Sequence, residues 1–133
     1  MSKSHPDPKT RILLTDTPDQ ISSKIKSAVT DSISTITYEP ETRPGVANLL
    51  SIWAGLAGQR SPEELAKTCS DAAQLKDRLK EVLIERLDPI RREYERLSQD
   101  QGYLLQVEKD GARKAEETAA KTLARVKTVM GLQ

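Results

Sequence analysis

The basic side chains near the C-terminus have the type and spacing to bind a polyanion. At about 100° per residue, Lys114, Lys121 and Arg125 fall within one narrow stripe of a helix. Residues 111–133 carry five basic and two acidic side chains, and Lys121 repels Arg125 one turn further on. A bound polyanion would relieve that repulsion. The alternative is a solvated helix face, partly neutralised by a pair between Glu117 and Lys121.

The other reactive residue types form no recognisable site. Cys69 is the only cysteine and His5 the only histidine, which excludes an internal disulfide and disfavours zinc binding or a Cys–His nucleophile. We therefore expect no metal site and interpret Cys69 as a small, half-buried hydrophobic residue. Trp53 lies in an apolar segment and is expected in the core rather than as a platform for stacking bases.

Composition and charge predict one small domain with an aliphatic core. The chain has 133 residues, of which 36% are hydrophobic and none is phenylalanine. The formal net charge of +1 gives no general attraction for polyanions, so a nucleic-acid role depends on local patches. We find no apolar segment long enough to cross a membrane and no secretory signal after Met1. These features favour the cytosol or an organelle matrix.

Prolines divide the first part of the chain into short elements. The capping box Thr17-Pro18-Asp19-Gln20 predicts a helix that runs to about Thr30. Its buried face would consist of Ile21, Ile25, Ala28 and Val29. The β-branched, turn-rich segment 31–43 is a connection that could include a short strand. Pro44 is expected to open an apolar central helix, and Gly58 is expected to terminate it.

The second part of the chain is continuous and helical. Ser61-Pro62-Glu63-Glu64 is a second capping box, followed by a long helix over about 73–97 that contains Pro89. Arg91, Arg92 and Arg96 alternate with acidic residues, which favours a salt-bridged exposed face. Asp100 can cap a last helical region. Its expected buried face is apolar, with Ala112, Ala115, Ala119, Leu123, Val126 and Met130.

These elements predict an all-α fold, a small helical bundle with an irregular N-terminal loop segment. A nucleotide-binding α/β domain would need strands that alternate with helices and a Gly-rich turn, and the sequence has neither.

Several blocks follow one another in an order that resembles a known family. The most specific are Ala-Val-Thr-Asp-Ser at 28–32 and Arg-Pro-Gly-Val-Ala-Asn-Leu-Leu at 43–50. Met-Ser-Lys-Ser at 1–4 and Ile-Leu-Leu-Thr-Asp at 12–16 precede them, and Gly-Ala at 111–112 follows. Together they resemble the C-terminal part of bacterial-type tryptophanyl-tRNA synthetases, which are class I aminoacyl-tRNA synthetases. The bacterial and mitochondrial members look closer than the eukaryotic cytosolic ones.

The resemblance implies roles for both ends of the chain. Residues 1–16 would be the KMSKS-type loop and its connection, without the first lysine of that motif. In it, Met1, Ser2, Lys3 and Ser4 would bind ATP, and Lys3 would be catalytic, because an ammonium stabilises the charge on departing pyrophosphate. The alternative is a disordered terminus. Residues 17–133 would be an anticodon-binding-like helical domain, in which the tRNA-binding side chains are Lys114, Lys121 and Arg125.

The whole enzyme implied by the resemblance is a tryptophan–tRNA ligase that uses ATP with Mg²⁺ and forms a homodimer. We expect this chain to be a monomeric fragment whose partner is tRNA(Trp), and to be inactive and without a bound cofactor on its own. The mitochondrial matrix is favoured over a bacterial-type cytoplasm. The alternative function is a non-catalytic helical protein-interaction module that uses the aliphatic face of residues 75–97.

Overall fold

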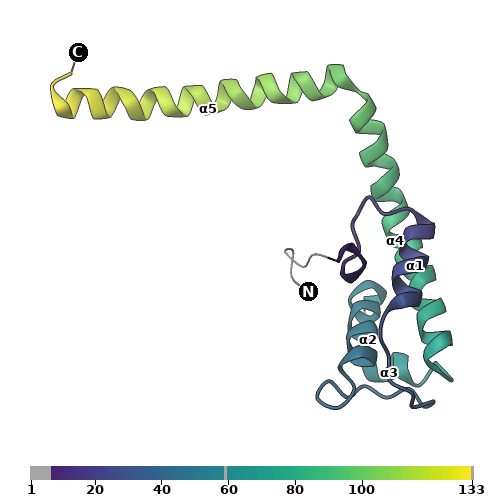
Figure 1. The fold of residues 1–133 in the computed structure, drawn as a ribbon. Coiled ribbons are helices and arrows are strands. Elements are labelled where there is room, and N and C mark those ends of the chain that lie inside the picture. The colour runs from purple at the N-terminus through teal and green to yellow at the C-terminus, as the bar shows by residue number, and fades with distance from the viewer. Residues whose placement is uncertain (1–6, 59, 133) are drawn as a thin grey trace. The chain divides into compact units, whose positions relative to one another are not determined.

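The computed structural model describes residues 7–58 and 60–132, and all the regular structure in them is helical (Figure 1). A short 3-10 helix, η1, precedes the α-helices α1 to α5. Their bounds are Pro8–Thr10 for η1, Pro18–Ser27 for α1, Pro44–Ala57 for α2, Pro62–Ala66 for α3, Ala72–Gln99 for α4 and Gln101–Met130 for α5. The described residues contain no strand, which confirms the predicted all-α class.

Local capping sets the start of two helices, as the sequence predicts. At α1, the Gln20 amide donates to the Thr17 hydroxyl at 3.3 Å and the Thr17 amide donates to the Gln20 side chain at 2.8 Å. At α3, Ser61 and Glu64 make the same reciprocal pair, at 3.3 and 3.1 Å. Each box satisfies amides at a helix start that have no partner within the helix.

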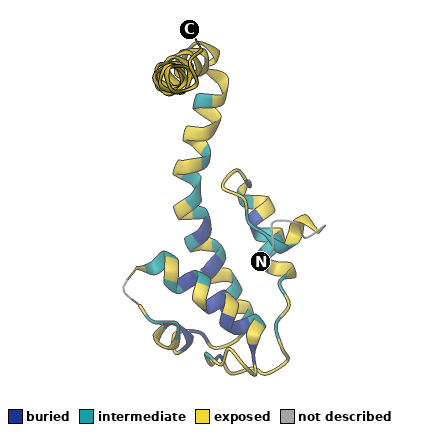
Figure 2. Ribbon diagram, turned by 90° about the vertical axis from the view of Figure 1, so that its left-hand side faces the viewer, coloured by how far each residue is buried: buried dark blue, intermediate teal, exposed yellow. Residues whose placement is uncertain are grey.

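The chain divides into two compact units, Met1–Arg92 and Glu93–Gln133, so the boundary falls within α4. The first unit holds the core, which draws on α1, α2, α3 and the first half of α4 (Figure 2). The side chains with the least exposure are aliphatic: Ile21, Leu50, Leu65, Leu75, Leu79 and Val46. An aliphatic core is what a chain without phenylalanine must build.

The predicted central helix is confirmed in α2. Val46 and Leu50 are 0% exposed and Trp53 is 6% exposed, so the tryptophan belongs to the core. Cys69 is also buried, and desolvation raises the pKa of its thiol. The small hydrophobic role expected of this cysteine is therefore confirmed.

The buried parts of α1 and α4 are shorter than the apolar patterns of their sequences. Val29 was predicted to be buried on the α1 face, which is wrong, because α1 ends at Ser27 and Val29 is 85% exposed. Along α4, Leu75, Leu79 and Leu83 are buried, but Tyr94 is 57% exposed. A helical period persists only while the helix continues, and burial requires an opposing surface.

The predicted buried face of the last helix is also wrong. Asp100 caps α5 through the Tyr103 amide at 2.9 Å, and Gly131 ends the helix in the left-handed conformation, as expected of a glycine there. None of the residues of α5 is buried, however. The residues predicted to face a core are all exposed: Ala112, Ala115, Ala119, Leu123, Val126 and Met130.

Candidate functional site

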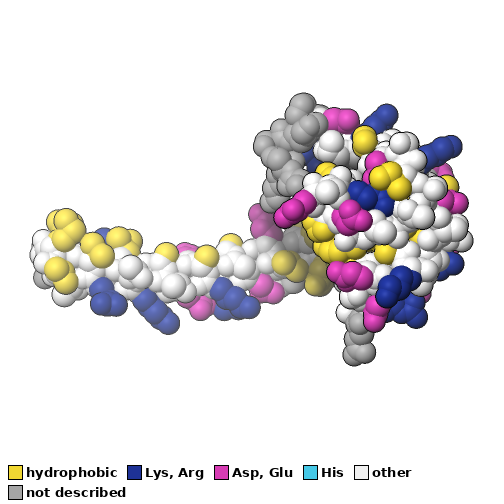
Figure 3. Space-filling view, turned by 90° about the horizontal axis from the view of Figure 1, so that it is seen from below, with side chains coloured by type: hydrophobic (Ala, Val, Ile, Leu, Met, Phe, Trp, Pro, Cys, Tyr) yellow, Lys and Arg dark blue, Asp and Glu magenta, His cyan; other side chains and the backbone are white. Residues whose placement is uncertain are grey.

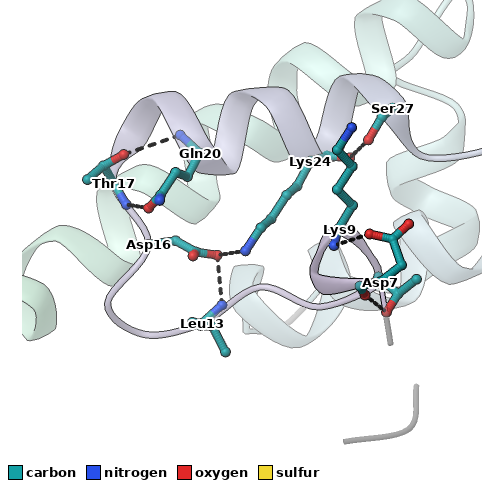
Figure 4. Close-up of polar contacts among 9 residues, drawn as sticks. Asp7, Lys9, Leu13, Asp16, Thr17, Gln20, Lys24 and Ser27 are labelled. Atoms are coloured by element: carbon teal, nitrogen blue, oxygen red, sulfur yellow. Dashed lines mark hydrogen bonds and ion pairs between the residues drawn. The ribbon is translucent and has the colours of Figure 1, made fainter. Parts of the chain in front are cut away.

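The predicted nucleotide chemistry belongs to the N-terminal segment of the chain. Met1, Ser2, Lys3 and Ser4, the predicted ATP-binding residues, lie outside the residues that the structure describes. The description begins at Asp7, whose carboxylate accepts the Lys9 amide at 2.8 Å and caps η1 (Figure 4).

A buried ion pair holds the connection to α1. The Lys24 ammonium lies 2.5 Å from Asp16 Oδ2, and the same oxygen accepts the Leu13 amide at 2.8 Å (Figure 4). Asp16 is 4% exposed. The pair therefore ties the segment after the N-terminal residues to the side of α1. The two residues are eight apart in the sequence, and their types alone did not predict this pair.

A cavity lies between η1, α1 and α2, which all belong to the first unit. The cavity measures about 400 Å³, and its walls combine apolar Ile12, Leu49 and Ile52 with basic Lys9 and Lys24. Apolar walls with a few charged groups are typical of small-ligand sites. This is the described cavity nearest in sequence to residues 1–4.

A buried arginine organises the segment between α1 and α2. Arg43 is 5% exposed and binds both carboxylate oxygens of Asp31, at 2.8 and 2.7 Å. Its remaining N–H groups reach the carbonyls of Ile33 and Thr35 and the hydroxyl of Thr37. Arg43 therefore ties Asp31 to the strand-free segment that follows it and satisfies two backbone carbonyls there.

The two most specific sequence blocks meet at this point. Asp31 belongs to the block at 28–32, and Arg43 opens the block at 43–50. Next to Arg43, Gly45 approaches the chain so closely that a Cβ there would lie 2.4 Å from the Val29 carbonyl oxygen. Any larger residue would force two backbone segments apart. The blocks are therefore the two sides of one tertiary contact.

The contribution of this contact to stability is expected to fade in acid. The hydrogen bond from Arg43 lowers the pKa of Asp31 from 3.8 to about 2. A carboxyl with a depressed pKa in the folded state stabilises fully above its unfolded value and loses its effect as pH falls through the folded value. We therefore expect Asp31→Asn to lower the urea midpoint by a constant amount above about pH 5. That difference should shrink between about pH 4 and 2. A difference that stays constant down to pH 2 would contradict the assignment.

The predicted basic stripe lies on the surface of α5. Lys114, Lys121 and Arg125 are exposed, and no ion pair joins them to an acidic side chain within the described part of the chain. Figure 3 shows Lys, Arg, Asp and Glu side chains along one edge of this helix and apolar ones along the other. Glu117 pairs with Arg113 at 2.8 Å, so the predicted pair between Glu117 and Lys121 is wrong.

Three arginines of α4 form ion pairs on the helix surface, as predicted. Asp88 pairs with Arg91 and, at 2.7 Å, with Arg92, while Arg96 pairs with Glu93 at 2.7 Å. These are pairs within one helix, three or four residues apart. These ion pairs explain the three arginines, and no bound ligand is needed to explain them.

Comparison with known proteins decides the family. Residues 1–88 match the family described as tRNA synthetases class I (W and Y).

The chain belongs to this family.

Relatives of the chain within this synthetase family include tryptophan–tRNA ligases. The chain is 42% identical to the ligase of the cyanobacterium Nostoc sp., over 98% of this chain and 39% of the relative. The mitochondrial ligase of Saccharomyces cerevisiae is also 42% identical, over 98% of this chain and 35% of the relative. The fold matches the crystal structure of tryptophanyl-tRNA synthetase from Mycoplasma pneumoniae with a TM-score of 0.74 and 29% identity, covering 100% of this chain and 41% of that one. The resemblance to tryptophanyl-tRNA synthetases is thus confirmed.

The chain therefore spans about two-fifths of the length of the synthetases it matches. Among the described residues, no helix has both the length and the apolar character to cross a membrane. Nor do three or more His, Cys, Asp or Glu side chains gather there as a metal site.

Proposed function

We propose that this chain supplies the ATP-contacting loop and the helical tRNA-binding part of a tryptophan–tRNA ligase. The observation that carries the proposal is the 42% identity to the Nostoc ligase over 98% of the chain. The TM-score of 0.74 to a tryptophanyl-tRNA synthetase supports the same function from the fold.

The proposed reaction is the activation of tryptophan and its attachment to tRNA(Trp). The carboxylate of tryptophan attacks the α-phosphorus of ATP, the bond from that phosphorus to the oxygen it shares with the β-phosphorus breaks, and tryptophanyl-adenylate forms as pyrophosphate leaves with Mg²⁺. A hydroxyl of tRNA(Trp) then attacks the tryptophanyl carbonyl, loses its proton, and AMP leaves as the ester forms. Lys3 would stabilise the negative charge on the departing pyrophosphate, since an ammonium is a mobile point charge. Met1, Ser2 and Ser4 would complete the loop around the triphosphate.

A chimera tests this function directly. The matching region of the Nostoc ligase is replaced by this chain, and tryptophan-dependent ATP–pyrophosphate exchange and tRNA charging are measured. The family match and the shared fold lead us to expect both activities. A folded chimera without exchange would overturn the proposed function.

The basic stripe of α5 would contact tRNA phosphates. Its side chains are lysine and arginine without interleaved aromatic residues, which suits the RNA backbone better than base edges. We expect Lys121→Ala in the chimera to weaken tRNA binding and to flatten the salt dependence of log K by about one unit. Binding is measured across a salt series, and tryptophan activation should not change.

The matched control for this prediction is Lys127→Ala. Lys127 follows Lys121 by six residues, which places it about 240° further around the same helix and off the stripe. The variant Lys127→Ala removes the same charge as Lys121→Ala. Because Lys127 lies off the stripe, we expect the salt slope of log K to stay near that of the parent. If both variants bind tRNA like the parent, the stripe is a solvated face.

The partners and the compartment follow from the same proposal. The whole enzyme would be a homodimer that binds tryptophan, ATP and tRNA(Trp), and this chain alone would be monomeric and hold no cofactor. The relatives include bacterial ligases and a mitochondrial one. We propose the mitochondrial matrix, with a bacterial-type cytoplasm as the alternative.

The protein-interaction module is the weaker candidate. Its proposed surface was the aliphatic face of residues 75–97, but Leu75, Leu79 and Leu83 belong to the core. The part of α4 that could bind a partner is therefore the short exposed end around Ile90 and Tyr94.

A further inference from the structure

A second basic surface lies within the first unit, on α1 and α4. Helix α1 and the first half of α4 border a cavity of about 570 Å³, which we name the α1–α4 groove. Its floor includes Ile25 and Ala73, and its charged lining consists of Lys26, Lys76 and Lys80 with the single acid Asp77. The volume is within the range of about 300–1,000 Å³ typical of ligand sites.

The charges of the groove do not cancel. Asp77 pairs with Lys80 at 2.8 Å, and its side chain is 68% exposed, so water screens this pair. Lys26 and Lys76 form no ion pair with a described acid. Two ammonium charges therefore remain along a groove with an apolar floor.

One of these charges is held in place by the backbone. The Lys76 ammonium donates to the carbonyl oxygen of Ala28 at 2.7 Å and to that of Lys26 at 3.4 Å. These carbonyls lie at the C-terminal end of α1, where the helix dipole favours a cation. Because Lys76 is already ordered, its side chain loses little further conformational entropy when it contacts a ligand.

We propose that the α1–α4 groove binds a phosphodiester of RNA, a contact separate from the stripe on α5. The inference rests on the proposed tRNA-binding function and extends it to the first unit. Lysines are point charges, and several of them along an open groove can neutralise successive phosphates of a polymer backbone. The apolar floor suits the sugar that accompanies each phosphate.

Lys26→Ala is the variant that tests the groove. The Lys26 side chain is exposed, and the contact of this residue with Lys76 uses its backbone carbonyl, so the substitution leaves the tether in place. We expect the 133-residue chain with Lys26→Ala to bind a tRNA(Trp) transcript several-fold more weakly. The salt slope of log K should fall by about one unit. Asp77→Asn removes the negative charge of the groove and should strengthen binding.

Lys67→Ala is the matched control, because Lys67 is exposed and does not line the groove. If the parent chain binds tRNA and Lys26→Ala binds it with an unchanged slope, the groove proposal is overturned and the proposed function stands. If the parent chain binds no RNA, both the groove and the stripe on α5 are overturned, and the exchange assay on the chimera still tests activation. Saturable binding of inorganic phosphate alone, abolished by Lys26→Ala, would make the groove a free-anion site and would also overturn the proposal.

Discussion

Lys3→Ala in the Nostoc chimera is expected to lower the rate of tryptophan activation by about 10²–10³-fold. That is the usual effect of removing one donor that stabilises charge in a transition state. The measurement is tryptophan-dependent ATP–pyrophosphate exchange under saturating substrates. Binding of tRNA should remain at the level of the parent, because the proposed tRNA contacts lie on α5 and in the α1–α4 groove.

Lys109→Ala is the control for this prediction. Lys109 is an exposed lysine of α5, so its substitution removes the same charge far along the sequence from the loop. It should leave the exchange rate unchanged. An exchange rate for Lys3→Ala within a factor of about two of the parent would remove the assigned catalytic role. The unfused 133-residue chain is expected to show no exchange.

Leu79→Ala is expected to destabilise the chain by roughly 2–5 kcal/mol, the range observed when leucine is truncated in a packed core. Leu79 is 0% exposed on α4 and belongs to the cluster that α1, α2 and α3 share. The loss combines the transfer free energy of the deleted atoms with the cavity they leave. Urea unfolding followed by circular dichroism measures it.

Leu123→Ala provides the matched control for the core prediction. Leu123 also lies within a long helix but is 55% exposed, so the same truncation removes little buried surface. We expect a change of less than about 0.5 kcal/mol. Equal losses for the two variants would mean that α5 contributes a packed face of its own.

Sequence by itself determined where the helices begin and which family the chain belongs to. Thr17, Ser61 and Asp100 cap the helices predicted from them, at α1, α3 and α5. A cap is local, since its side chain bonds an amide three residues away, and sequence spacing therefore suffices. The blocks at 28–32 and 43–50 likewise carried the family resemblance.

The tertiary structure decided which polar residues meet. Lys24 is eight residues from Asp16, and Arg43 is twelve from Asp31. Neither spacing brings two side chains into contact within a single helix or strand, so no local rule pairs them. The α1–α4 groove was unpredicted for the same reason, because Lys26 and Lys76 come together only when α1 packs beside α4.

Burial along the helices shows the same division. The period of the apolar residues indicates an amphipathic face on both α4 and α5, and each helix has one in the structure. On α5 the apolar edge is visible in Figure 3. On α4, Leu75, Leu79 and Leu83 are buried because α1, α2 and α3 supply an opposing surface. On α5, Leu123 and Val126 are exposed because no described segment covers them. The apolar period is a property of the helix sequence alone. Burial also requires an opposing surface, and the sequence of the helix does not show whether another element supplies one.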